Sequence, residues 1–107
     1  MSLKLPPVVR LMEVGPRDGL QNEAVLVDTK SKIQFIENLA ASGHKRIEIT
    51  AFVSPAWIPQ LGDQVEVAMG IKKDPSVSYA ALVPNVQGYE KALLCDVSEI
   101  SMVVAAT

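Results

Sequence analysis

The sequence predicts an α/β fold in which strands and helices alternate in the order βαβαβαβ. The spacing of apolar residues switches repeatedly between the pattern of a buried strand and that of an amphipathic helix. Hydrophobic residues make up 49% of the 107-residue chain, which is enough apolar surface for a packed core. Strands that alternate with helices pair in parallel through right-handed crossovers.

The first predicted strand covers residues 8–14, VVRLMEV, and ends at Gly15-Pro16. Because it is too apolar for a strand with one solvated face, we expect both faces to be covered. The first helix begins at Asp28 or Thr29, since short side chains with an acceptor oxygen favour the N-cap position. It ends at Gly43, where a helix C-terminus favours a positive φ.

The later elements continue the alternation. A second strand is predicted over Arg46–Phe52, where β-branched residues gather. Asp63 is placed to cap a second helix, and Lys72-Lys73 at the end of that helix complements its dipole. The third strand, third helix and fourth strand are predicted over residues 77–83, 87–94 and 99–105.

Two architectures have this order of elements: a doubly wound open sheet and the first half of a (β/α)₈ barrel. A complete barrel needs about 250 residues, whereas this chain supplies three βα units and a fourth strand. A half barrel would leave its sheet edges unpaired, which is an aggregation hazard. The barrel interpretation therefore implies that the chain is truncated.

Composition and charge exclude several classes of function. The formal net charge is −2, and lysines and arginines are spread along the chain, so nothing favours binding to nucleic acid or to an anionic membrane. No apolar run reaches the roughly 18 residues of a membrane span. The chain start lacks a signal-peptide core, and the single cysteine, Cys95, cannot form an internal disulfide. We expect a cytoplasmic protein.

Polar groups are densest in residues 15–23, the loop after the first predicted strand. In folds of this class, function lies in the loops that follow the C-terminal ends of the strands. Arg17 offers a planar fork of donors that suits a carboxylate, an enolate or a polarised carbonyl. Asp18 is a hard oxygen ligand that suits Mg²⁺ or Mn²⁺, and Gln21 is a candidate for orienting a substrate. The alternative is an ordinary polar turn with an Arg–Asp pair.

One carboxylate, Glu48, lies inside the second predicted strand between two isoleucines. A buried carboxylate is costly unless it is paired. In a closed barrel Glu48 would point inward, where Arg17 would pair with it. Glu13, in the first predicted strand, is a second candidate of the same kind. The alternative for each is a carboxylate that faces solvent.

Three further positions are less specific. Asn85 follows the third predicted strand, where it serves either as a ligand contact or as the N-cap of the next helix. Trp57, the only tryptophan, lies in the loop after the second strand, and we favour a packed loop over a wall of the site. Cys95 is expected to be a small buried hydrophobe rather than a nucleophile.

The string Glu13–Glu23, EVGPRDGLQNE, closely resembles the N-terminal signature of the 3-hydroxy-3-methylglutaryl-CoA lyases. The resemblance continues through Ile47–Thr50, IEIT, and Phe52–Gln60, FVSPAWIPQ, and it covers nearly the whole chain in order. The Arg-Asp-Gly-x-Gln core marks a wider superfamily of metal-dependent barrel lyases, whereas the longer strings are much more specific to the lyase.

The resemblance implies that residues 1–107 are the N-terminal portion of a single TIM-barrel lyase domain. It implies cleavage of 3-hydroxy-3-methylglutaryl-CoA to acetyl-CoA and acetoacetate with Mg²⁺ or Mn²⁺. By position, Asp18 resembles the metal ligand, Arg17 the residue that holds the thioester oxygen, and Glu48 the third member of the triad. Gln21 and Asn85 are expected to bind substrate. An acyl-CoA substrate, a homodimer and a role in leucine catabolism are family expectations.

The sequence departs from the family in one respect. The family's other metal ligands, a His-x-His pair and an Asn, and its loop with a reactive cysteine have no counterpart in this chain. We therefore expect an isolated 107-residue chain to be inactive. The alternatives are a related acyltransferase that makes isopropylmalate or homocitrate, a 4-hydroxy-2-oxoacid aldolase, and a non-catalytic half-barrel module.

Overall fold

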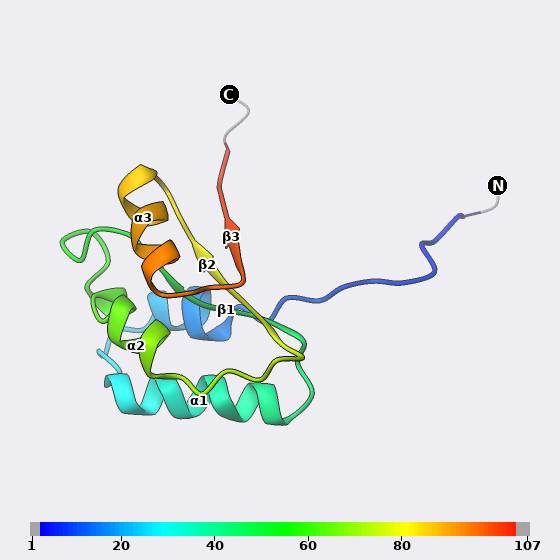
Figure 1. Cartoon of the computed structure of the whole chain (residues 1–107), viewed down its shortest axis with the longest axis horizontal. Coiled ribbons are helices and arrows are strands. Elements are labelled where there is room, and N and C mark those ends of the chain that lie inside the picture. Colours follow the sequence, from blue (N-terminus) through cyan, green and yellow to red (C-terminus); the bar gives the residue numbers. More distant parts are fainter. Residues whose placement is uncertain (1–2, 105–107) are drawn as a thin grey trace.

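A parallel sheet with the strand order β1-β2-β3 forms the centre of the fold (Figure 1). The computed structural model describes residues 3–104. The strands are β1 (Arg46–Ala51), β2 (Ser78–Leu82) and β3 (Glu99–Ser101). The helices are α1 (Thr29–Ala41), α2 (Gln64–Gly70) and α3 (Val86–Leu94), with a π-helical turn η1 (Gly15–Gly19) and a 3₁₀ turn η2 (Pro59–Leu61).

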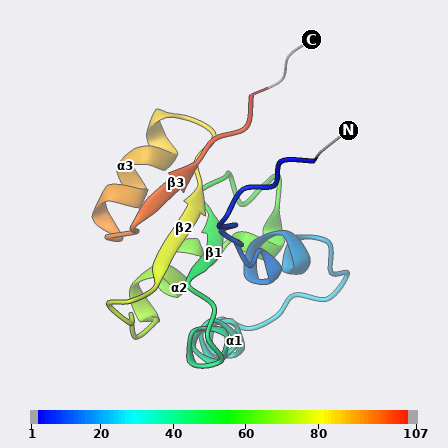
Figure 2. The same cartoon turned by 90° about the vertical axis from the view of Figure 1, so that its right-hand side faces the viewer.

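The three α-helices pack on one face of the sheet (Figure 2). This arrangement distinguishes the doubly wound sheet from the half barrel. Ile47 and Ile49 of β1 and Tyr79 of β2 point into a core shared with Ile36 of α1 and Ala92 of α3. A doubly wound sheet carries helices on both faces, whereas a barrel carries them on its outer face alone. The sequential strand order and the single helical layer are those of a barrel segment.

The predicted first strand is wrong as a strand. Within residues 8–14 only Glu13 forms a bridge, parallel to Ile47 of β1. Val8, Val9 and Leu11 are 69–79% exposed, so the expectation that both faces are covered is also wrong. Among the described residues β1 is the one strand that pairs with this segment, and Figure 1 shows the N-terminal part of the chain leaving the body of the fold. Residues 8–12 make no backbone hydrogen bond to a strand within residues 3–104, whereas the Val14 carbonyl accepts from the amides of the turn η1.

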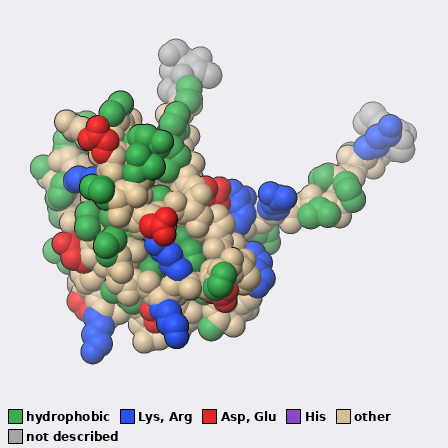
Figure 3. Space-filling view, in the orientation of Figure 1, with side chains coloured by type: hydrophobic (Ala, Val, Ile, Leu, Met, Phe, Trp, Pro, Cys, Tyr) green, Lys and Arg blue, Asp and Glu red, His purple; other side chains and the backbone are tan. Residues whose placement is uncertain are grey.

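The predicted fourth strand is shorter than expected. β3 forms over Glu99–Ser101, and its pairing with β2 ends at the Leu82–Ser101 pair, where β2 itself ends. Residues 102–104 follow as exposed chain, and Ala105 lies outside the described residues. Figure 3 shows apolar side chains gathered over α3 and along both terminal segments. The exposed apolar residues there include Val86, Leu93, Leu94, Met102 and Val103.

The remaining helices and strands are confirmed, and their bounds lie within three residues of the predictions. Asp28 caps α1, since its carboxylate accepts a 2.9 Å hydrogen bond from the Ser31 amide. Gly43 follows this helix with φ +106°, as predicted for its end. No helix within residues 3–104 is both long and apolar enough to cross a bilayer.

Asp63 occupies the N-cap position of α2, but its carboxylate makes no capping hydrogen bond. It instead accepts 2.6 Å hydrogen bonds from Thr29 Oγ1 and from Lys32 Nζ, both on α1. The Lys32 ammonium is buried and also donates to the Gln60 carbonyl in η2. The predicted capping role is therefore wrong, because a buried cation on the neighbouring helix competes for the same carboxylate.

Candidate active site

The loop after residue 14 folds into the turn η1, which presents Arg17 and Asp18 at the end of the first predicted strand. The Val14 carbonyl accepts hydrogen bonds from the amides of Arg17, Asp18 and Gly19 at 3.1, 2.7 and 3.3 Å. Pro16 is buried at the start of the turn, where its missing N–H leaves no donor unsatisfied. The loop is therefore a hydrogen-bonded turn and not an irregular loop.

Arg17 and Glu48 form an ion pair between Arg17 Nε and Glu48 Oε1. The Glu48 side chain is 4% exposed and that of Arg17 is 18% exposed, so both charges are largely removed from water. Glu48 alternates with Ile47 and Ile49, and it therefore lies on the sheet face that the helices leave uncovered. The predicted contact is confirmed, because a buried carboxylate in a strand requires a partner.

The Arg17 guanidinium also joins Asp18 and Gln21 to the same cluster. Its Nη1 atom donates to Asp18 Oδ1 and to Gln21 Oε1, each at 3.3 Å. The Asp18 side chain is 54% exposed, whereas Glu48 is enclosed. The structure thus brings four of the five predicted site residues together, and their catalytic and binding roles stay predictions.

Asn85, the fifth predicted site residue, caps α3. Its Oδ1 atom accepts a 2.8 Å hydrogen bond from the Gly88 amide, as the N-cap alternative expects. Asn85 lines a separate hollow of about 350 Å³ with Val83, Tyr89 and Ile100. None of the hydrogen bonds of residues 3–104 joins it to the Arg17 cluster. Its predicted contact with substrate stays a prediction.

Trp57 is 83% exposed, so the packed-loop interpretation of this residue is wrong. The loop around it is nevertheless fixed, because the Gln60 side chain donates to the Glu23 carbonyl at 3.0 Å. Cys95 is buried, as expected, and burial raises the pKa of its thiol. The thiolate form is therefore disfavoured, which agrees with a packing role.

A divalent cation fits this site only through Asp18. Its half-exposed carboxylate is a hard oxygen donor of the kind that Mg²⁺ and Mn²⁺ take. Glu48 is already engaged by Arg17. Among the described residues, no group of three or more His, Cys, Asp or Glu side chains is arranged to hold a metal ion. Residues 3–104 thus offer one candidate metal ligand, Asp18.

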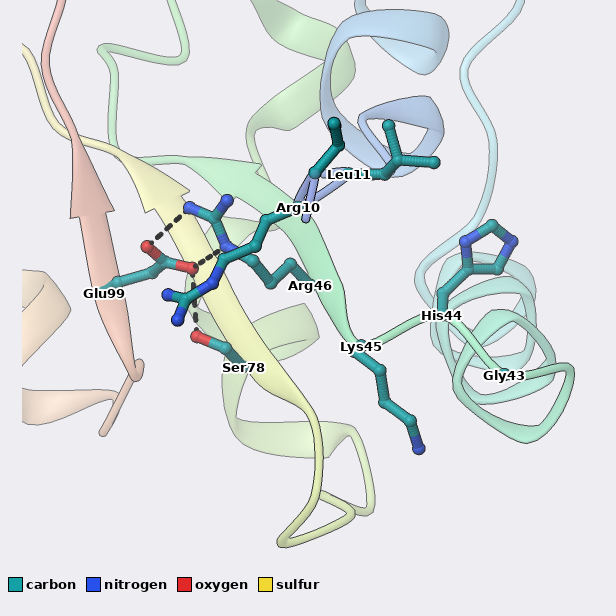
Figure 4. A pocket seen from close by; sticks show the side chains of 9 residues that line it. Arg10, Leu11, Gly43, His44, Lys45, Arg46, Ser78 and Glu99 are labelled. Carbon is teal, nitrogen blue, oxygen red and sulfur yellow. Dashed lines mark hydrogen bonds and ion pairs between the residues drawn. The ribbon is translucent and has the colours of Figure 1, made fainter. Parts of the chain in front are cut away.

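Another hollow, of about 700 Å³, lies at the opposite, N-terminal ends of the strands (Figure 4). Arg46 makes two 3.0 Å hydrogen bonds to the Glu99 carboxylate, joining β1 to β3 across β2. Ser78 Oγ donates to the same carboxylate at 3.0 Å, and Arg10 points toward it. In barrel proteins this end carries stability and the opposite end carries chemistry. We therefore place the candidate site at Arg17.

The Glu99 pair predicts a pH dependence of folding. The Arg46 guanidinium lowers the pKa of the Glu99 carboxyl, and the Ser78 hydroxyl adds to this effect. A carboxyl whose pKa is lower in the folded state stabilises the fold above its ordinary pKa, and this contribution is lost as the pH falls through the folded value. The stability difference between the natural protein and Glu99→Gln should therefore shrink on acidification, as measured by urea unfolding at pH 7 and pH 3. A constant difference would contradict it.

Two residues gained roles that the sequence did not reveal. The expectation that Glu13 points inward beside Glu48 is wrong, because Glu13 pairs with Ile47 and so lies on the helix-covered face. Its Oε1 atom accepts a 3.0 Å hydrogen bond from the Gly15 amide. Lys32 was not singled out, although its spacing from Ile36 places it on the inner face of α1.

The chain matches known proteins along almost its whole length. A model of the HMGL-like family matches residues 8–107. The chain is 48% identical over 105 residues to a 3-hydroxy-3-isohexenylglutaryl-CoA/hydroxy-methylglutaryl-CoA lyase of Pseudomonas aeruginosa, covering 98% of this chain and 35% of that relative. It is 50% identical over 103 residues to a cytoplasmic 3-hydroxy-3-methylglutaryl-CoA lyase of Homo sapiens, covering 96% of this chain and 28% of that relative.

Solved structures agree with this relationship. The HMG-CoA lyase of Bacillus subtilis superposes with a TM-score of 0.92 at 48% identity, covering 98% of this chain and 35% of that one. An HMG-CoA lyase of Acinetobacter baumannii in complex with coenzyme A and 3-methylmalate superposes with a TM-score of 0.90 at 40% identity, covering 94% and 33%. The chain spans about a third of the length of the relatives it matches. It belongs to the HMGL-like family.

Proposed function

We propose that residues 1–107 are the N-terminal portion of a TIM-barrel lyase domain that cleaves 3-hydroxy-3-methylglutaryl-CoA to acetyl-CoA and acetoacetate. The observation that carries the proposal is the Arg17 cluster, in which a largely buried cation is held by Glu48 beside the half-exposed carboxylate of Asp18. Relatives named as lyases of this thioester, at 48–50% identity, support it.

The chemistry requires a cation where negative charge develops. In a retro-Claisen cleavage a general base takes the proton of the tertiary hydroxyl, whose oxygen becomes the ketone of acetoacetate as the neighbouring C–C bond breaks. The electron pair of that bond moves onto the thioester carbonyl as an enolate, and a proton returned to the enolate carbon gives acetyl-CoA. We propose that Arg17 donates to the enolate oxygen through its Nη2 atom, while Nε stays bound to Glu48 and Nη1 donates to Asp18 and Gln21. A fixed donor at a developing oxyanion contributes about 10²–10³ in rate. Glu48 orients the guanidinium and balances its charge.

Metal dependence is general in the HMGL-like family. We propose that Asp18 is a ligand of Mg²⁺ or Mn²⁺, with the family's His-x-His and Asn ligands lying outside this chain. Such a cation, when bound, acidifies a coordinated hydroxyl and polarises a carboxylate. Asp18 and Arg17 share a 3.3 Å contact, so the metal ligand and the enolate-binding cation would stand at adjacent parts of one substrate.

The remaining assignments are finer parts of the same proposal. We propose that Gln21 orients the acyl-CoA substrate, since it contacts Arg17 at 3.3 Å. Asn85 uses its Oδ1 atom as a helix cap, so a substrate contact would come from its Nδ2 donors. A homodimer, a cytoplasmic location as in the human relative's name, and a role in leucine catabolism are included in the proposal.

Two measurements test it. The intact mass of the native protein, purified from its source, establishes whether the chain continues; a mass near 30 kDa, from roughly 250 or more residues, is expected. The native protein should then release acetoacetate from the methylglutaryl thioester with Mg²⁺ or Mn²⁺ and lose this activity in a chelator. Condensation of acetyl-CoA with a 2-oxoacid and no thioester cleavage would instead favour the acyltransferase alternative.

A chimera separates the contribution of this chain from that of the rest of a barrel. In it, residues 1–107 replace the matching third of the Pseudomonas aeruginosa lyase, which is 48% identical over 105 residues. We expect the chimera to cleave the thioester and its Asp18→Ala variant to be inactive. The isolated 107-residue chain should not turn over, and acetoacetate release from a chain of verified mass 11.5 kDa would refute that expectation.

A further inference from the structure

We propose that Glu13 is a positioning residue for the active-site turn, which it holds through the hydrogen bond from the Gly15 amide to its carboxylate. This inference rests on the proposed function, because it assigns Glu13 the task of placing Arg17 and Asp18. Glu13 reaches the turn by a 3.0 Å contact between Gly15 N and Glu13 Oε1.

The backbone of the turn leaves one donor that only an outside acceptor can satisfy. The amides of Arg17, Asp18 and Gly19 all donate to the Val14 carbonyl, and Pro16 has no amide hydrogen. The amide of Leu20 donates to carbonyls inside the turn. Gly15 is left as the unsatisfied donor at the start of a helical turn, where an anionic side chain is a favourable partner. Glu13 supplies that partner.

Glu13 also joins the turn to the strand that carries Glu48. Its amide donates to the Arg46 carbonyl, and its carbonyl accepts from the Glu48 amide, each at 2.9 Å. The main chain of Glu13 thus fixes the position of the turn along β1 relative to Glu48. The side chain of Glu13 fixes the direction in which the turn begins. Arg17 and Glu48 lie 31 positions apart in sequence, so their side chains meet only if the position and the direction of the turn are both fixed.

The direction of the Glu13 side chain excludes a direct role in chemistry. Because Glu13 pairs with Ile47, its carboxylate lies on the face of the sheet that the helices cover, opposite Glu48. A methyl group built on Gly15 would lie 3.0 Å from Glu13 Oε1 and 3.1 Å from Phe35 Cζ of α1. The half-buried carboxylate therefore lies beside the turn and α1. It neither reaches the substrate face nor approaches Asp18 as a second metal ligand.

The chemical difference between glutamine and leucine tests this assignment. Glu13→Gln keeps an acceptor oxygen for the Gly15 amide, whereas Glu13→Leu fills the same space without one. In the native protein we expect Glu13→Leu to lower kcat about 10²-fold, the cost of misplacing a catalytic group by about 1 Å, with a smaller change in KM. Glu13→Gln should retain most of kcat. Glu90→Leu, on the exposed side of α3, is the matched control and should be unchanged.

The outcomes separate the possible roles. Equal loss of kcat in both variants would overturn the proposal in favour of a catalytic carboxylate, and wild-type kcat in Glu13→Leu would overturn it outright. If Glu13→Leu does not fold, Gly15→Ala provides the second variant. Its methyl group would crowd the carboxylate, 3.0 Å away, without removing it, and we expect it to reproduce the fall in kcat. Wild-type kcat in Gly15→Ala would then overturn the proposal.

A measurement that needs no turnover keeps this inference distinct from the proposed function. The amide proton resonance of Gly15 should move upfield in Glu13→Leu and stay near its original position in Glu13→Gln, because it reports the hydrogen bond directly. An unmoved resonance in Glu13→Leu would overturn the assignment. The resonance can move as expected even if neither the unaltered protein nor its variants release acetoacetate. In that case the proposed function fails and the contact between Glu13 and the turn stands.

Discussion

Replacing Arg17 with methionine in the native protein is expected to lower kcat for thioester cleavage about 10²–10³-fold, the cost of removing one donor from a developing oxyanion. The guanidinium is the only cation in contact with Glu48 among the described residues, and its side chain is 18% exposed. Steady-state kinetics over a range of thioester concentrations measures the effect. A rise in KM with kcat unchanged would contradict a role in the transition state.

Arg17→Lys is the matched control for charge. Lysine keeps the positive charge but lacks the fork that donates to Glu48 and to a second oxygen together. We expect its kcat to fall as well, though less than that of Arg17→Met. Arg17→Met also leaves the 4% exposed carboxylate of Glu48 unpaired, which costs about 3–5 kcal/mol when a buried pair loses one partner. Kinetics should therefore be measured where urea unfolding shows each variant to be folded.

Replacing Asp63 with alanine is expected to destabilise the native protein by about 3–5 kcal/mol, because it leaves a buried cation unpaired. Lys32 is 4% exposed, and its ammonium group is held by Asp63 Oδ1 at 2.6 Å and by the Gln60 carbonyl. The same change removes the 2.6 Å hydrogen bond from Thr29 to Asp63. The free energy of unfolding in urea measures the loss.

The double variant Lys32→Met/Asp63→Leu distinguishes an unpaired charge from a merely lost contact. Replacing both members of a buried ion pair with apolar residues is often neutral or stabilising, so the double variant should be more stable than Asp63→Ala. Asp28→Ala, which removes the cap of α1, is the comparison variant, and its loss of stability should be smaller than that of Asp63→Ala. A double variant no more stable than Asp63→Ala would show that the charge of Lys32 is not the cause.

Local sequence patterns predicted the central helices and strands well. The predictions failed where contacts with residues distant in sequence determine the structure. The cap at Asp28 and the turn at Gly43 depend on their own side chains and backbone, so the sequence sufficed. Residues 8–14 read as a strand because they are apolar, yet among the described residues only Glu13 of this segment finds a strand partner, Ile47 of β1. Asp63 stands at a cap position, but only the fold reveals that Lys32 lies beside it.

The sequence predicted the candidate site where the chemistry of one residue requires a particular partner. A carboxylate between two isoleucines requires a cation, and Arg17 was the one placed at the neighbouring strand end, so the contact with Glu48 followed. Asn85 offered two roles that residue type alone does not separate. Glu13 was misplaced because its face depends on the register of one bridge with Ile47, and a shift of one residue moves a side chain to the opposite face.

The single bridge between Glu13 and Ile47 has a consequence for hydrogen exchange. Among residues 3–104, this bridge and the pair between Arg17 and Glu48 are the hydrogen-bonded links that join the turn to β1, whereas β1 and β2 are paired along their length. The turn should therefore open in a sub-global fluctuation of low free energy, while the amides of Ile49 and Tyr79 exchange only on wider unfolding. A ligand that bridges Arg17 and Asp18 would slow exchange in the turn first, since it binds only the closed form.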